Sequence, residues 1–348
     1  MEDPYSARFH LSQSGRNPGD TQPVEGLQMD QDFAHQPVMA AEVVELFGPV
    51  PPGLVVDATV GGGGHAAALL EAHPHLSLLG IDQDPDAVAA ATGALARFRG
   101  RATVVRDRFD RLAAVVRSFL DRPGAGVSGV LIDLGVSSPQ LDRPERGFSY
   151  RTSGPLDMRM DQAGALSAAD VVNGYSTAEL TRLFMASGEG RLAARIARAI
   201  VAGRPHADTA ELAEVVASAV PAAARRRGHP ARRVFQAIRM EVNAEVPALA
   251  AALDGVEAIM GPGGRCCVLS YHSGEDKVVK ARFGEWADGG CQCPPGLPCA
   301  CGAVPVARLL NRRARRATPA EVEANPRAKA ARLRAVEWVG AGPDEGRP

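Results

Sequence analysis

Four consecutive glycines, residues 61–64, limit the possible folds of this chain more than any other feature. They follow a short apolar run, residues 54–56, that ends on Asp57, and they precede an Ala- and Leu-rich run that begins at His65. Glycine lets the backbone approach a ligand closely, and the N-terminus of a helix offers N–H groups to that ligand. A strand, a glycine-rich turn and a helix in this order predict a nucleotide-binding turn over residues 57–65, with a tight turn that binds nothing as the simpler alternative.

Further apolar runs at 76–81, 103–105 and 130–134 alternate with helical patterns. This rhythm is typical of a parallel sheet covered by helices, so we expect an α/β fold with a Rossmann-like sheet. From Leu141 to about Glu245 the pattern shows only turns and amphipathic helices. A helix at 247–260, a turn at 261–264 and a strand at 265–270 then resume the sheet.

The predicted domain organisation follows from these patterns. We expect a core domain formed by residues 35–141 and 247–348, and an all-helical insertion domain formed by residues 142–246. Residues 1–34 are polar and rich in Gly, Pro, Gln and Asp, so they cannot bury enough apolar surface to order themselves and are predicted to be a disordered tail.

Composition excludes several classes of protein. No apolar run approaches the roughly 20 residues that span a bilayer, and the N-terminus lacks a secretory pattern, so we expect a cytoplasmic protein without a membrane partner. All six cysteines lie between residues 266 and 301, which is not how a disulfide framework is distributed. The net charge of −1 gives no global attraction to nucleic acid, so such binding must rest on local basic surfaces. Nothing in the sequence fixes the oligomeric state.

Two carboxylates near the glycine-rich turn favour S-adenosylmethionine as the ligand. Asp57 ends the strand four residues before Gly61, where it could meet the ammonium group of that cofactor. Asp82 ends the next strand and could accept hydrogen bonds from ribose hydroxyls, which nicotinamide cofactors also carry. Since Gly61, Gly63 and Ala66 satisfy the relaxed dinucleotide fingerprint, a nicotinamide or flavin enzyme remains an alternative.

The reaction centre is predicted after the strand at 130–134. Asp133 ends this strand, and Ser138-Pro139-Gln140 follows in a loop that should face the same crevice as the glycine-rich turn. This loop is similar to those of enzymes that methylate exocyclic amines of bases, but it lacks their aromatic residue, so base stacking stays unassigned. Such an amine needs acceptors for its N–H bonds, and the candidate catalytic residues are Asp133, Ser138 and Pro139.

Methylation at pyrimidine C5 would instead need a nucleophilic cysteine. Cys266 and Cys267 lie within an apolar run and are interpreted as core residues.

Taken together, these motifs make the chain resemble the RsmH (MraW) family, bacterial methyltransferases that act on a cytidine N4 of 16S ribosomal RNA. The similarity covers residues 35–39, 57–65, 133–148, 156–160, 234–245, 270–279 and 325–327. The resemblance implies an S-adenosylmethionine-dependent enzyme whose target lies in the decoding region, with the small ribosomal subunit as partner. It also implies a cofactor site formed by Gly63, Gly64, His65, Asp82, Phe109, Asp133 and Gln140.

Local basic clusters supply candidate RNA contacts. One cluster has almost no acidic neighbours before Glu241 and is predicted to bind phosphates; it comprises Arg225, Arg226, Arg227, Arg232 and Arg233. Arg191, Arg195 and Arg198 recur at helical spacing and are interpreted as a solvated helix face. The segment 308–334 carries nine basic residues and only Glu321 and Glu323 against them, so it is a further candidate for RNA backbone contacts.

Two polar segments near the C-terminus leave alternatives open. His272 could orient the base or a phosphate, or Ser273 with Asp276 could cap a helix there. Cys291, Cys293, Cys299 and Cys301 have spacing that could hold one structural zinc ion, with uncoordinated thiols on a Pro-rich loop as the alternative.

Three hypotheses therefore remain from the sequence: an RNA amine methyltransferase, which is favoured, a nicotinamide-dependent oxidoreductase, and a non-catalytic RNA-binding protein. Within the first, an N4-cytosine DNA methyltransferase is the nearest competitor.

Overall fold

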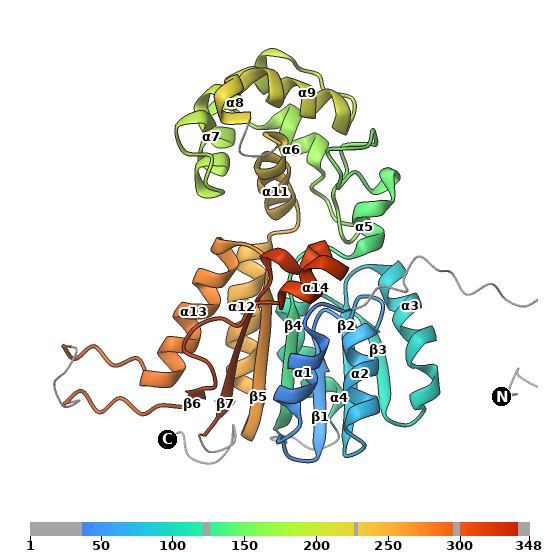
Figure 1. Ribbon diagram of the computed structural model, residues 1–348, viewed down its shortest axis with the longest axis vertical. Coiled ribbons are helices and arrows are strands. Elements are labelled where there is room, and N and C mark those ends of the chain that lie inside the picture. Colours follow the sequence, from blue (N-terminus) through green and yellow to red (C-terminus); the bar gives the residue numbers. More distant parts are fainter. Residues whose placement is uncertain (1–36, 121–125, 226–228, 295–299, 340–348) are drawn as a thin grey trace, which may run out of the picture. The chain divides into compact units, whose positions relative to one another are not determined.

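A seven-stranded sheet with the order β3-β2-β1-β4-β5-β7-β6 forms the centre of the computed structural model, which describes residues 37–339 except 121–125, 226–228 and 295–299. Strands β1 to β5 are parallel, and β7 is antiparallel to both β5 and β6 (Figure 1). The strands are β1 (Gly53–Asp57), β2 (Leu76–Asp82), β3 (Ala102–Arg106), β4 (Val127–Asp133), β5 (Met260–Ser270), β6 (Ala307–Leu309) and β7 (Arg332–Trp338). The predicted α/β fold is confirmed, and the predicted disordered tail lies outside the described residues.

Helices cover both faces of the sheet, which explains why its strands are continuous apolar runs. Neighbouring residues of β1 show this: Val55 packs on one face, against α1 and α2, and Val56 packs on the other, against α12. The first layer comprises α1 (Ala40–Phe47), α2 (Gly64–Ala72) and α3 (Pro85–Leu95). The second comprises α4 (Leu112–Phe119), α12 (Glu245–Ile259) and α13 (Ser273–Asp288). Short 3₁₀ turns follow α3 (Ala96–Phe98) and precede α4 (Phe109–Arg111).

Helices also make up the segment inserted between β4 and β5, where the described residues contribute no strand to the sheet. They are α5 (Ser138–Asp142), α6 (Ala168–Gly174), α7 (Thr177–Ala186), α8 (Ala193–Ala202), α9 (Thr209–Ala219), α10 (Ala222–Arg225) and α11 (Ala231–Val242), with 3₁₀ turns at Pro144–Arg146 and Gly190–Leu192. Ser176 and Glu179 form the predicted capping box at the start of α7. Ile196 and Ile200 are fully buried in a hydrophobic cluster that belongs to this segment alone.

A buried ion pair joins the insertion to the sheet layer. Arg146 lies 2.9 Å from Asp84, which caps α3, and their side chains are only 5% and 3% exposed. Within the insertion, Asn243 fixes the segment that follows Arg146, because its amide accepts from Met160 N–H and donates to the Met158 carbonyl. The sheet and the insertion together form one compact unit. The boundaries at 142 and 246 therefore stay a proposal, based on the separate hydrophobic cluster.

One expected turn is part of a strand instead. Strand β5 begins at Met260, which pairs with Val127, and the ladder resumes at Arg265 opposite Gly129. The glycine-rich residues between them form an irregularity within β5 rather than a turn before it, and Gly263 has a positive φ of 73° there.

The segment after β6 returns to the sheet through α14 (Pro319–Ala324) and a 3₁₀ turn (Pro326–Ala330). None of the helices within the described residues is long and apolar enough to cross a membrane.

Candidate active site

A crevice of about 450 Å³ lies at the carboxyl ends of β1, β2 and β4. Its floor is formed by the glycine-rich turn, Asp82, Asp133 and the segment that leads into α5. Residues of the insertion, including several from α11, form the opposite wall. The volume suits a ligand of cofactor size, and the position is the one where open parallel sheets bind ligands.

Hydrogen bonds to the second strand fix the glycine-rich turn. Gly61 has a φ of 51°, and its N–H donates to Oδ2 of Asp82 at 2.9 Å. Gly64 and His65 line the crevice as predicted. Gly63 is not among the lining residues, because it faces α3, where an added Cβ would lie 3.3 Å from Cα of Ala91. Any contact between Gly63 and a ligand must therefore come from its backbone.

Three carboxyl groups converge where β1, β2 and β4 end. Burial raises the pKa of Asp57 to about 7 and the pKa of Asp82 to about 6, and burial also raises the pKa of Asp133. The negative charges of Asp133 and Asp82 raise the pKa of Asp57 further. Asp82 and Asp133 line the crevice, whereas Asp57 is 1% exposed and accepts from Thr59 N–H beneath it. A cationic or hydrogen-bond-donating ligand would favour the ionised form of this cluster.

Asp133 is held by groups from two other parts of the chain. Its Oδ1 accepts a 2.8 Å hydrogen bond from the hydroxyl of Tyr271, which follows β5. Its Oδ2 lies 3.6 Å from Nδ1 of His65. Since Nε2 of His65 lies 2.9 Å from the carbonyl of Val38, which can only accept, Nε2 carries the ring hydrogen. The hydrogen bond from Tyr271 thus restricts the carboxyl of Asp133, which lines the crevice.

The residues that follow β4 form the short helix α5, and hydrogen bonds fix its side chains. Ser137 caps α5, and the side chain of Gln140 closes the capping box and donates to Asp84 at 2.9 Å. The hydroxyl of Ser138 accepts a hydrogen bond from Arg327, and the carbonyl of Pro139 accepts from Arg143 N–H at 3.1 Å. Ser138, Pro139 and Gln140 all line the crevice, but much of their hydrogen-bonding capacity is used within the protein.

Aromatic side chains, which the sequence motifs left mostly unassigned, come from several elements. Phe109, one of the predicted cofactor-site residues, lines the crevice at the start of the 3₁₀ turn before α4. Phe148, Tyr150 and Phe235 line it from the insertion, and the ring of Tyr150 stacks on His229 at 4.8 Å between centroids. The sequence did contain a signal for two of them: Phe148 and Tyr150 lie two positions apart in a chain with only 5% aromatic residues.

His272 rather than Ser273 caps α13. Its Nδ1 accepts from the N–H groups of Gly274 and Glu275, and Glu275 accepts in return from the N–H of His272. The proposed cap of Ser273 with Asp276 is therefore wrong, because the extended backbone of His272 places its own ring over the helix N-terminus.

Comparisons with known proteins agree with this geometry. The model of the MraW methylase family matches residues 32–339. The chain belongs to this family. It is 48% identical over 317 residues to ribosomal RNA small subunit methyltransferase H of Symbiobacterium thermophilum, which covers 89% of this chain and 98% of that protein. It is 50% identical over 316 residues to the protein of the same name from Thermobifida fusca, which covers 87% and 93% respectively. The predicted methyltransferase is confirmed at the level of the family.

The basic cluster of this MraW family member is only partly described. Arg232 lines the crevice from α11, and Arg233 is exposed beside it. Arg225 donates to the carbonyl of Val220. Arg226 and Arg227 lie outside the described residues. Contact of this cluster with RNA stays a prediction.

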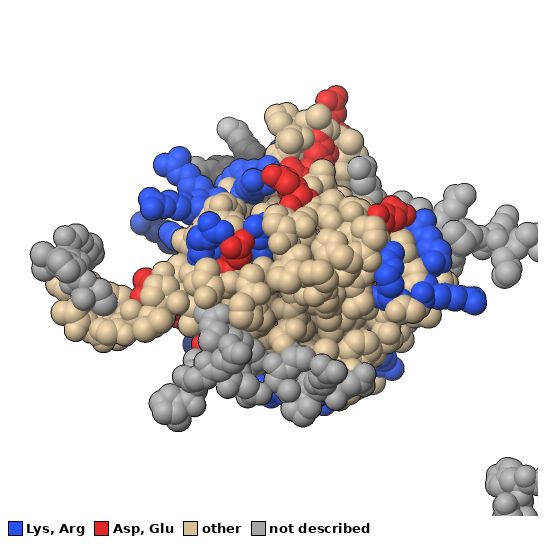
Figure 2. All heavy atoms as spheres, turned by 90° about the horizontal axis from the view of Figure 1, so that it is seen from below, with Lys and Arg blue, Asp and Glu red and all other residues tan. Residues whose placement is uncertain are grey.

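The arginines of the C-terminal segment are more strongly paired than expected. Arg332 and Arg334 bind Asp276, and Arg315 binds Glu45. Arg308 binds Glu337. These carboxylates lie outside the segment 308–334, so a count of charges within the segment does not include them. Contact of this segment with RNA stays a prediction. The face of the molecule seen from below shows Lys and Arg in separate groups, with Asp and Glu beside some of them, around a centre of other residues (Figure 2).

The cysteines of this methylase fall into two groups. Cys266 and Cys267 are 1% and 0% exposed within β5, and burial raises the pKa of Cys267 to about 12, so the interpretation as core residues is confirmed. Cys291, Cys293 and Cys301 converge in the segment between α13 and β6. Cys299 lies outside the described residues.

Proposed function

We propose that this MraW family member transfers a methyl group from S-adenosylmethionine to N4 of a cytidine in the decoding region of 16S ribosomal RNA. We further propose that it acts in the cytoplasm, on RNA within the small ribosomal subunit. The printed name of its relatives supports a small-subunit RNA substrate. The observation that carries the proposal is the pair of carboxyl groups, Asp82 and Asp133, that line a crevice beside the glycine-rich turn, with the buried Asp57 near both.

The residues present fit S-adenosylmethionine. This cofactor carries an ammonium group, a sulfonium and a ribose diol, and each of these favours ionised carboxylates beside it. Asp82 would accept from the ribose hydroxyls, Phe109 would pack against adenine, and Asp133 would neutralise positive charge, with Asp57 buried beneath the crevice. When bound, the cofactor supplies an electrophilic methyl carbon.

Asp133, at the end of β4, would activate the amine. The lone pair of a cytosine N4 is delocalised into the ring, so an acceptor must draw on its N–H bonds before it becomes nucleophilic. Asp133 lines the crevice and offers such an acceptor, because the hydrogen bond from Tyr271 goes to Oδ1 rather than to Oδ2. As the N–C bond forms and the C–S bond breaks, N4 must lose one proton, which the carboxylate of Asp133 receives.

The insertion forms the wall against which the base rests. Tyr150 and Phe235 supply aromatic surface for a single-stranded or flipped base, and Arg232 lies where a flanking phosphate would pass. None of the described cysteines lines the crevice, so the arrangement suits direct transfer to an amine better than covalent C5 chemistry.

Nucleoside mass spectrometry of ribosomal RNA tests the proposal. Cells that lack the protein should lack N4-methylcytidine at one position of 16S RNA, and the purified protein with S-adenosylmethionine should restore it on isolated small subunits. A methyl group found on C5, on a ribose oxygen or only on DNA would contradict the proposed function.

A further inference from the structure

Two clusters in the described part of the chain bring three metal-ligating side chains together. The first, Glu245, His272 and Glu275, belongs to the crevice already described. Its groups have partners, because Glu245 binds Arg239 through two hydrogen bonds of 2.7 and 2.8 Å and both His272 and Glu275 cap α13. A cation there would have to displace a guanidinium, so this cluster carries no metal site.

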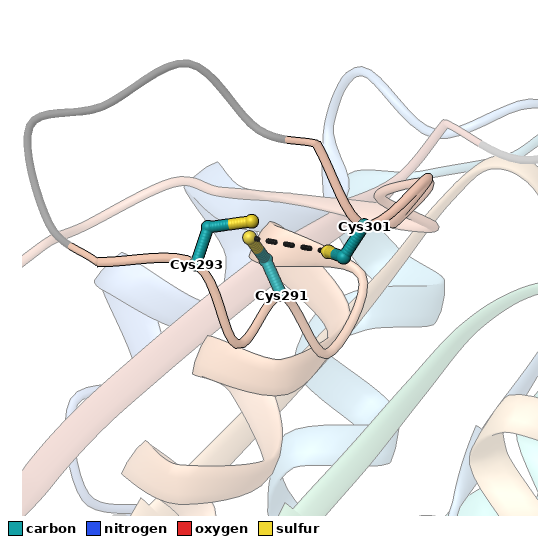
Figure 3. Close-up of side chains that lie close together, drawn as sticks. All are labelled: Cys291, Cys293 and Cys301. Atoms are coloured by element: carbon teal, nitrogen blue, oxygen red, sulfur yellow. Dashed lines mark hydrogen bonds between the residues drawn. The ribbon is translucent and has the colours of Figure 1, made fainter.

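The second cluster has no role in the crevice. The sulfur atoms of Cys291, Cys293 and Cys301 lie within 4.8 Å of one another, in the segment between α13 and β6, and point toward a common centre (Figure 3). The distance from Sγ of Cys301 to Sγ of Cys291 is 3.6 Å. The N–H of Ala300 also donates to Sγ of Cys293 at 3.3 Å, and such a bond favours a thiolate at that position.

We propose that Cys291, Cys293 and Cys301 bind one zinc ion. A zinc–thiolate bond of about 2.3 Å places the sulfurs of a tetrahedral site roughly 3.8 Å apart, close to the distance between Cys301 and Cys291. A disulfide would instead need about 2.05 Å. Sulfur ligands in a tetrahedral arrangement select zinc over the harder cations magnesium and calcium. Cys299, the fourth ligand expected from sequence, lies outside the described residues.

The surrounding segment explains what the ion would stabilise. Residues 289–306 contain no charged side chain, and none of the residues described in this range is fully buried, with Val304 74% exposed. Its two ends are fixed: Gly289 ends α13 with a φ of 66°, and Val306 N–H donates to the carbonyl of Trp286 at 2.9 Å. A zinc ion would close the chain between these anchors, which is the usual function of structural thiolate sites in small segments without a core.

Metal analysis of the full-length protein tests this inference independently of methyl transfer. After purification under reducing conditions without chelators, we expect about one zinc per chain. Replacement by Co²⁺ should produce the intense thiolate-to-metal and tetrahedral absorption bands that magnesium-type oxygen sites lack. Cys291→Ser and Cys301→Ser should each lower the zinc content at least tenfold and remove the cobalt bands.

Cys266→Ala is the matched control, since this cysteine is buried in β5 and should leave the zinc content unchanged. All three variants should still bind S-adenosylmethionine, because the cluster is not part of the crevice. Wild-type protein without zinc and without cobalt bands would overturn the proposal. So would a disulfide between Cys291 and Cys301 found by mass spectrometry of metal-free protein, whereas the proposed methyl transfer would stand in either case.

Discussion

The hydroxyl of Tyr271 donates a 2.8 Å hydrogen bond to Oδ1 of Asp133, although 138 residues separate them in the chain. The sheet explains this contact. Asp133 ends β4 and Tyr271 follows β5, and these two strands are parallel neighbours whose carboxyl ends meet at the same edge. The helical insertion occupies most of the intervening sequence, so the strands that form the reaction centre also place the insertion above it.

Tyr271→Phe should therefore reduce catalysis while leaving the fold intact. The hydroxyl lowers the pKa of Asp133, which burial raises, so its removal should move the acid limb of the kcat profile to higher pH. Loss of a hydrogen bond to a charged group corresponds to about 1.5–3 kcal/mol, or roughly 10- to 100-fold in kcat. A pH–rate profile on small subunits measures both effects, and a variant with the wild-type profile would show that Tyr271 only packs.

Binding of S-adenosylmethionine should depend on the ionisation of Asp82. Burial raises the pKa of Asp82 to about 6, and the ionised carboxylate is the better acceptor for two ribose hydroxyls. Affinity should therefore increase as the pH rises from 5 to 7, by up to about tenfold per pH unit below 6. Calorimetry with Asp82→Asn should show weaker binding with a flatter pH dependence. Asp82→Ala should lose on the order of 1–3 kcal/mol at pH 7. If both variants kept full affinity, Asp82 would not be the acceptor for the ribose hydroxyls.

Asp57 should destabilise the cofactor-free protein at neutral and higher pH. Burial raises its pKa to about 7 in the folded state, from an ordinary 3.8, so the folded chain holds a proton that the unfolded chain releases. The free energy of unfolding should therefore fall as the pH rises from about 4 to 7. Asp57→Asn keeps an acceptor for Thr59 N–H and should be more stable than wild type at pH 8, by on the order of 2–4 kcal/mol. Urea unfolding at pH 5 and pH 8 gives the comparison, and parallel curves for both proteins would refute it.

The buried pair of Asp84 and Arg146 should matter far more for stability than any exposed pair. Arg146→Met leaves the carboxylate of Asp84 buried without its cation and should lower the free energy of unfolding by about 3–5 kcal/mol. Arg97→Met is the matched control, because Arg97 and Glu71 form an ion pair with both side chains more than half exposed, and it should change stability by at most about 1 kcal/mol. Equal effects of the two variants would show that the pair at Asp84 does not hold the insertion in place.

The sequence patterns predicted most helices, strands and turns because each of these is determined by residues close together in the chain. The glycine-rich turn, the apolar runs of β1 to β4 and the capping box at Ser176 are decided by neighbouring residues, so the amino-acid sequence alone suffices to identify them. Asp82 and Asp133 were predicted on the crevice because the carboxyl ends of parallel strands share one edge.

Long-range partners could not be predicted in the same way. Arg146 and Asp84 are 62 residues apart, and Arg315 and Glu45 are 270 residues apart, so a local charge count could not pair them. The surroundings of Gly63 could not be predicted for a similar reason: the motif requires a glycine there, but only the packing of α3 shows that an added side chain would meet that helix. Tyr150 was missed because it belongs to the insertion, and its position on the crevice depends on how that segment folds back.

Two pairs of exposed arginines should differ in their contribution to RNA binding. Arg232 lines the crevice and Arg233 is exposed next to it in the first turn of α11, whereas Arg195 and Arg198 lie exposed on α8. Arg232→Ala with Arg233→Ala should weaken binding of small-subunit RNA and reduce the slope of log affinity against log salt by roughly 0.7–0.9 for each lost phosphate contact. Arg195→Ala with Arg198→Ala removes the same charge and should leave the slope unchanged.

Tyr150→Ala should act differently from both arginine variants, because stacking on a base is not electrostatic. It should weaken RNA binding by about 1–3 kcal/mol without changing the salt dependence, and it should raise KM for RNA while binding of S-adenosylmethionine stays unaltered. Filter binding over a range of salt concentrations distinguishes the three variants. If both arginine pairs lowered the slope equally, RNA would be held by overall charge rather than by the first turn of α11.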